Sequence, residues 1–288
     1  MKEIAAAEKT ENARLTKKDI EGVPAVSCVE YYALAYLGKR MDVRKLYAES
    51  FLPFGRTLKD FAAGARYENY PLPRIQDTAE KLGVWKHECF SLPEPVRGRL
   101  NLMEVNDYFF YGAKQRPWRA DHFITLDKAG ENLRYLNCYP LSEGEFGRAE
   151  ALRCFGGRML SYAYSGGFDE SAYEKLAGEQ YSLVCRREKA AVPALGALPL
   201  RNAAAILKVS RQRTLSWLRH ESGRGAFFFD ETLENIAEKL VSLYKKLIVA
   251  AELMSIKKNE NPEVLKARLA DIALLENKFA ENVRRKRR

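Results

Sequence analysis

The stretch ADHFITLDKAGENLRYLNCYP, from Ala120 to Pro140, contains two short apolar runs separated by turn-forming residues. The runs extend from His122 to Leu126 and from Leu133 to Tyr139, and residues 127–132 between them are rich in polar residues and Gly. Short apolar runs bounded by such residues are typical of strands. The stretch therefore predicts an antiparallel hairpin, and a further strand is predicted over Asn101–Phe110.

This hairpin gives a rare histidine a defined neighbour. The chain has three histidines among 288 residues, and His122 heads the first run. Because successive side chains alternate between the faces of a strand, a register that pairs Leu126 with Leu133 puts His122 opposite Asn137. An imidazole held by a side-chain carbonyl has a fixed tautomer and direction, which a general base requires.

Other registers of the hairpin remain open. A shift of two residues offers Tyr135 or Tyr139 to His122, and a shift of one residue offers Cys138. The partner of the imidazole is then a phenol or a thiol.

A cysteine near the start of the chain is the natural nucleophile for such a base. Residues 24–38, PAVSCVEYYALAYLG, predict a helix that begins near Ser27 or Cys28. The first turn of a helix has unpaired N–H groups and a positive dipole end, which stabilise a thiolate and can hold an oxyanion. We therefore expect a catalytic group of Cys28, His122 and Asn137. The alternative interpretation is a small buried cysteine and a half-buried polar histidine.

The residue composition and the spacing of apolar residues change along the chain. Residues 1–22 are a polar lead-in, and residues 23–190 combine short apolar runs, aromatic residues, Gly and Pro, which is typical of the α+β class. Residues 191–288 have apolar residues spaced by three and four, which predicts helices. Asp230 is expected to cap one long helix, and Asn-Pro at 261–262 is expected to begin another. We expect these helices to form an antiparallel pair.

Composition narrows the class of protein. Hydrophobic residues make up 47% and charged residues 30% of the chain, as in soluble globular proteins. The sequence lacks both a run of ~18 apolar residues and an apolar signal-peptide core, so we expect no membrane association and a cytoplasmic location.

Five cysteines without a CxxC pair predict neither a zinc site nor a disulfide framework, and no cofactor or metal motif is present. The formal net charge of +10 favours an acidic partner.

Several stretches resemble the butirosin-biosynthesis acyltransferase family, which has a papain-like fold. That family has an early cysteine opening a helix, an acidic residue in an aromatic strand, a histidine heading a strand, and an acidic or amide residue before a proline on the next strand. The resemblance covers about residues 23 to 145, and the family's usual Asp directly before the proline is replaced by Tyr139, so that Asn137 is the nearest orienting group. The stretches that carry it are Cys28–Gly38, Leu46, Asn106–Tyr111, Asp121–Leu126 and Leu133–Pro140.

The resemblance implies a papain-like N-terminal domain, in which the cysteine helix packs on an antiparallel sheet, and a cytoplasmic enzyme of specialised metabolism such as antibiotic biosynthesis. The Cys28 thiolate would take an acyl group from an acidic acyl carrier protein or another thioester. His122 would move the proton, and a small-molecule amine acceptor would then attack the acyl-enzyme. With water as the acceptor the enzyme is a peptidase or a thioesterase. A protein with the same fold and no catalytic activity would be a scaffold.

Residues 200–223 support a rival interpretation. The string AAILKVSRQRTLSWL resembles a helix-turn-helix, with a turn that ends at Ser210 as the cap of a second helix. That helix would present Arg211, Gln212 and Arg213 to a DNA groove. The protein would then be a regulator that binds nucleic acid.

Overall fold

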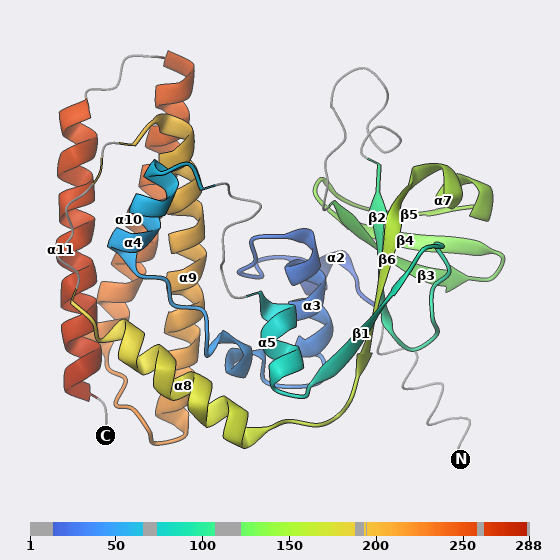
Figure 1. Ribbon diagram of the computed structural model, residues 1–288, viewed down its shortest axis with the longest axis horizontal. Helices are drawn as coiled ribbons and strands as arrows, with labels where there is room; N and C mark the ends of the chain where they lie inside the picture. The colour runs from blue at the N-terminus through green and yellow to red at the C-terminus, as the bar shows by residue number, and fades with distance from the viewer. Residues whose placement is uncertain are drawn as a thin grey trace. The chain divides into compact units, whose positions relative to one another are not determined.

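The computed structural model describes residues 14–65, 74–106, 122–187, 193, 195–257 and 262–286 (Figure 1). The contacts within the chain divide it into two units. The first unit draws on the chain up to Val43 and from Ile75 to Glu170, and the second on Arg44–Arg74 and from Ser171 onward. The predicted domain boundary at residue 190 stays a prediction.

A six-stranded antiparallel sheet forms the centre of the first unit, with the strand order β1-β6-β2-β3-β4-β5. Four consecutive strands, β2 to β5, are neighbours, and β6 returns to pair with both β1 and β2. The predicted α+β class is confirmed for this unit. The predicted strand that begins at Asn101 corresponds to β2 as far as Val105. Residues 107–110 of that prediction lie outside the described part. The strands are β1 (Trp85–Phe90), β2 (Leu100–Val105), β3 (Phe123–Ala129), β4 (Asn132–Cys138), β5 (Leu141–Phe146) and β6 (Phe155–Tyr164).

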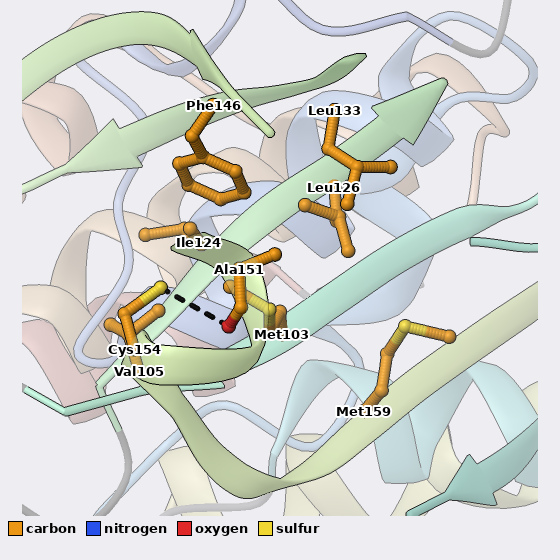
Figure 2. Close-up of a cluster of buried hydrophobic side chains, with 9 residues drawn as sticks. All are labelled: Met103, Val105, Ile124, Leu126, Leu133, Phe146, Ala151, Cys154 and Met159. Atoms are coloured by element: carbon orange, nitrogen blue, oxygen red, sulfur yellow. Dashed lines mark hydrogen bonds between the residues drawn. The ribbon is translucent and has the colours of Figure 1, made fainter. Parts of the chain in front are cut away.

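Helices cover both faces of this sheet. They are α2 (Lys17–Ile20), α3 (Cys28–Gly38), α5 (Ile75–Lys81) and α7 (Arg148–Cys154). Helices α3 and α5 lie on one side and α7 on the other (Figure 1). Under α7, apolar side chains from β2, β3, β4, β5 and β6 form a buried cluster, and the Cys154 thiol donates to the carbonyl of Ala151 over 3.4 Å (Figure 2). Cys154 therefore has a structural role in the core.

The β3–β4 hairpin turns more tightly than its composition suggested. Ala129 pairs with Asn132, so the loop has two residues, and its first residue, Gly130, has a φ of 63°. Two-residue hairpin loops favour residues that tolerate positive φ, and glycine does so without strain. Leu126 consequently pairs with Tyr135 and not with Leu133, so the predicted register is wrong by two residues.

The second unit is helical. The helices of the second unit are η1 (Val43–Tyr47), α4 (Phe54–Ala62), α8 (Glu170–Val184), α9 (Ala197–Gly223), α10 (Glu231–Lys257) and α11 (Pro262–Lys286). The first residues of η1 and α8, Val43 and Glu170, still belong to the first unit. The predicted cap of α10 is confirmed, because the Leu233 N–H donates to Oδ1 of Asp230 over 2.9 Å. Asn261 lies outside the described residues, and α11 begins at Pro262 as expected. Over the described ranges, no helix combines the length and the apolar character that crossing a bilayer requires.

The helix-turn-helix prediction for residues 200–223 is wrong. Helix α9 runs without interruption for 27 residues, and Ser210 lies in its middle. The Ser210 hydroxyl hydrogen-bonds the backbone of residues 50–52 and caps no helix. Arg211 and Arg213, which were expected to face DNA, are 1% and 0% exposed. A groove-reading arginine has to be exposed, so these two side chains cannot fill that role.

Candidate active site

Cys28 occupies the first position of α3, as the sequence predicts. Ser27 is the N-cap, and its side chain accepts the backbone N–H of Glu30 over 3.3 Å. The buried carboxylate of Glu30 reaches back to accept the N–H of Val26 over 2.9 Å. These two contacts satisfy N–H groups at the start of the helix and fix where it begins. The Cys28 thiol is consequently placed at the positive end of the helix dipole and is partly exposed.

The structure brings the three predicted site residues together. Sγ of Cys28 lies 3.8 Å from Nδ1 of His122, and Nε2 of His122 lies 3.1 Å from Oδ1 of Asn137. His122 is 9% exposed and Asn137 is fully buried. The thiol, the imidazole and the amide therefore form one continuous chain of contacts.

The amide determines which nitrogen of the imidazole carries a proton. Oδ1 of Asn137 is an acceptor, so Nε2 of His122 donates to it, and Nδ1 is the nitrogen that faces the Cys28 thiol and can take its proton. The backbone N–H of Tyr139 also donates to the same Oδ1 over 3.2 Å, which orients the amide. The arrangement suits a base that exchanges a proton with sulfur.

The contact between His122 and Asn137 is diagonal. In the observed register Ile124 pairs with Asn137, and two residues further the same register places Tyr139 opposite His122. His122 precedes the first residue of β3, and its carbonyl accepts the N–H of Val105 over 3.0 Å. Diagonal neighbours in a sheet are within reach of long and aromatic side chains. The predicted partner is therefore the one found, although the predicted register is not.

Contacts around the sulfur lower the pKa of Cys28 to about 5. The largest cause is a hydrogen bond from the Cys138 thiol; burial acts in the opposite direction. The hydrogen bond and charge of His122 and the backbone N–H of Phe123 lower the pKa further. Because the thiolate is the nucleophilic form of cysteine, Cys28 has the character of a nucleophile at neutral pH.

Two residues of this site escaped prediction as members of it. Tyr32 lies one helical turn after Cys28, is fully buried, and donates from its hydroxyl to the carbonyl of Leu136 over 2.9 Å. The same hydroxyl accepts the N–H of Cys138 over 2.8 Å. In the sequence, Cys138 stood out solely as an alternative partner of His122, whereas its thiol is the largest cause of the lowered pKa of Cys28. The spacing of four between Cys28 and Tyr32 was the available signal, since such residues share a helix face.

Other expected features lie elsewhere or outside the described residues. The acidic residue of the family's aromatic strand falls at Asp107, and Asp121 precedes the histidine; neither is described. Within the ranges that are described, His, Cys, Asp and Glu form no group of three or more that could hold a metal ion.

No protein-family model matches the chain, and no curated protein is similar to it in sequence. What the fold and the site define is an α+β protein with a six-stranded antiparallel sheet, in which a low-pKa cysteine at a helix start contacts a histidine oriented by an asparagine.

Proposed function

We propose that this protein is a papain-like cysteine acyltransferase, with Cys28 as nucleophile, His122 as the proton carrier and Asn137 as the residue that orients it. The single observation that supports this most is the contact chain from the Cys28 sulfur through both nitrogens of His122 to the Asn137 amide. The position of the sulfur at the N-terminus of an 11-residue helix adds to it, since developing negative charge is stabilised there.

In the proposed reaction, the Cys28 thiolate attacks the carbonyl carbon of a thioester, and the negative charge moves to the carbonyl oxygen. The tetrahedral intermediate expels the donor thiolate, which takes a proton from Nδ1 of His122. An amine then attacks the acyl-enzyme and loses its proton to Nδ1, and the Cys28 thiolate leaves. One amide bond is formed and one thioester is consumed.

The donor and acceptor classes rest on the resemblance to the butirosin-biosynthesis acyltransferase family. The net charge of +10 supports an acidic carrier protein as donor, since opposite charges accelerate docking. The amine acceptor has the resemblance as its support, and water in its place would make the enzyme a thioesterase or a peptidase.

Intact-mass measurement after incubation with acyl thioesters tests the proposal. The probes are acyl N-acetylcysteamine thioesters and an acyl-loaded acidic carrier protein. The wild-type chain should gain the mass of the acyl group, Cys28→Ala should not, and Cys89→Ala, which removes an exposed thiol of β1, should behave as wild type.

The acceptor is tested in a second step. Adding small amines to the isolated acyl-enzyme should discharge it with formation of an amide, whereas discharge in buffer alone would identify a hydrolase. A mass gain that persists in Cys28→Ala, or no gain with any donor while Cys28 still reacts with iodoacetamide, would overturn the proposal.

A further inference from the structure

A second thiol belongs to the site around Cys28. Cys138 is the last residue of β4 and directly follows Asn137, whose side-chain amide contacts the His122 imidazole that in turn contacts the sulfur of Cys28. Each of the two thiols shifts the pKa of the other. Its backbone N–H donates to the hydroxyl of Tyr32 over 2.8 Å. Because Tyr32 is four residues after Cys28 on α3, this bond ties the end of β4 to the helix turn that carries Cys28. Two cysteines 110 residues apart in the chain are thus held near one another by a separate, buried anchor.

Cys28 and Cys138 are both partly exposed. The other three cysteines have different settings. Cys154 is buried in the cluster under α7, Cys89 is exposed on β1, and Cys185 follows α8 in the second unit. The site therefore combines access, a reactive thiolate and an adjacent second thiol, which are the requirements for a reversible disulfide.

We propose that Cys28 and Cys138 form a dithiol site that hydroperoxides convert into a disulfide, which reversibly removes the Cys28 nucleophile. The inference goes beyond acyl transfer and depends on the two free thiols, so it stands whether or not the protein is an acyltransferase.

The chemistry has two balanced steps. The Cys28 thiolate attacks the terminal oxygen of a hydroperoxide; an S–O bond forms, the O–O bond breaks, and the alkoxide that leaves takes a proton to become an alcohol. The sulfur of Cys138 then attacks the resulting sulfenic acid; an S–S bond forms, the S–O bond breaks, and hydroxide leaves with the thiol proton as water. Two thiols lose two electrons, and the hydroperoxide gains them.

The charges of the site impose the order of these steps. The Cys138 pKa is raised, first by its hydrogen bond to Cys28, then by burial and by the negative charge of that thiolate. Cys138 is therefore protonated and unreactive while Cys28 is a thiolate. Once Cys28 becomes an uncharged sulfenic acid, two of these causes disappear and the pKa of Cys138 falls. The resolving thiol is activated by the product of the first step.

Oxidation of the reduced full-length chain with hydrogen peroxide tests the inference. Wild type should lose about 2 Da, the mass of two hydrogen atoms, and a peptide map should show Cys28 joined to Cys138. Labelling of Cys28 with iodoacetamide should be lost in parallel and restored by dithiothreitol. Cys89→Ser, the matched control, should behave as wild type.

Removing the resolving thiol should change the product. Cys138→Ser should gain about 32 Da at Cys28, a sulfinic acid that dithiothreitol does not reverse. A wild-type map with sulfinic acid and no Cys28–Cys138 link would overturn the inference, as would a loss of 2 Da in Cys138→Ser. The wild-type map needs no variant, so it decides the question even if the substitution impairs folding. Failure of the acyl-transfer assay would leave these masses unaffected.

Discussion

Nε2 of His122 contacts Oδ1 of Asn137 over 3.1 Å, although the two residues are not cross-strand partners. The two-residue loop at Gly130 sets a register in which Ile124 pairs with Asn137. The imidazole bridges the offset diagonally. The position of the amide is fixed independently of His122, because the N–H of Tyr139 also donates to its oxygen. Asn137 therefore acts as a preset acceptor for the imidazole.

Fast acylation of Cys28 should require both His122 and its acceptor Asn137. His122→Ala is expected to lower the rate by roughly 10²–10⁴-fold, the usual contribution of a general acid–base group. Asn137→Ala should show part of that loss, because the imidazole can then adopt the wrong tautomer. Asn137→Asp keeps an acceptor oxygen and should retain more of the rate. The measurement is the rate of acyl mass gain from a thioester as a function of pH.

An unchanged pH profile in Asn137→Ala would show that the amide does not act through the imidazole. Circular dichroism of each variant provides the control for folding, since Asn137 is fully buried.

The second thiol should help to keep Cys28 ionised. The pKa of Cys28 is about 5, and the hydrogen bond from Cys138 is the largest cause. Cys138→Ala removes this donor, so the pKa of Cys28 should rise, whereas Cys138→Ser retains a donor and should raise it less. The measurement is the rate of Cys28 alkylation by iodoacetamide against pH. Equal midpoints in wild type and Cys138→Ala would contradict the assignment.

The same pKa makes stability depend on pH. An unfolded cysteine has a pKa near 9 and Cys28 in the folded protein about 5, so between these values the unfolded state binds more protons. The free energy of unfolding should therefore rise with pH across this window, by up to about 1.4 kcal/mol for each pH unit, and this contribution is lost as the pH falls through about 5. Urea unfolding between about pH 5 and 8, in the presence of a reductant, measures it.

Cys28→Ala is the matched variant for this pH effect. Burial raises the pKa of Asp127 to about 6, and this contribution is common to both proteins. The difference between the two curves thus reports Cys28 together with His122, whose charge acts on the thiolate, and two parallel curves would refute the prediction.

In the second unit, a buried ion pair should matter for stability. The Arg211 guanidinium donates through Nε to both carboxylate oxygens of Glu276, over 2.8 and 3.0 Å, and through Nη2 to the carbonyl of Leu52 over 2.9 Å. Tyr244 donates to the same carboxylate over 2.6 Å. Arg211→Ala leaves the carboxylate buried without its cation, so we expect a loss of about 3–5 kcal/mol in the free energy of unfolding.

An exposed pair in the same unit provides the control. Nε of Arg201 lies 2.8 Å from Oε1 of Glu252, and both side chains are about half exposed. Arg201→Ala should cost about 0–1 kcal/mol, because water screens such a pair. Similar losses for Arg201→Ala and Arg211→Ala in urea unfolding would show that burial does not set the difference.

Predictions based on adjacent residues agree with the structure. The helix start at Cys28 follows from a capping serine, and the start of α10 follows from Asp230. Both depend on contacts within four residues, which the sequence displays directly. The helix-turn-helix prediction failed for the complementary reason. Ser210 has the side chain of a cap, but its hydroxyl bonds a segment about 160 residues away, which no local pattern reveals.

By itself, the sequence determined the α+β class and the cysteine at a helix start, because caps, turns and the spacing of apolar residues act over a few positions. Tertiary structure alone decided that His122 reaches Asn137 diagonally, that Cys138 is bonded to Tyr32 on the helix of Cys28, and that Arg211 is buried. Those facts depend on the geometry of a two-residue turn and on contacts between segments far apart in the chain, where side-chain reach and burial decide which groups meet.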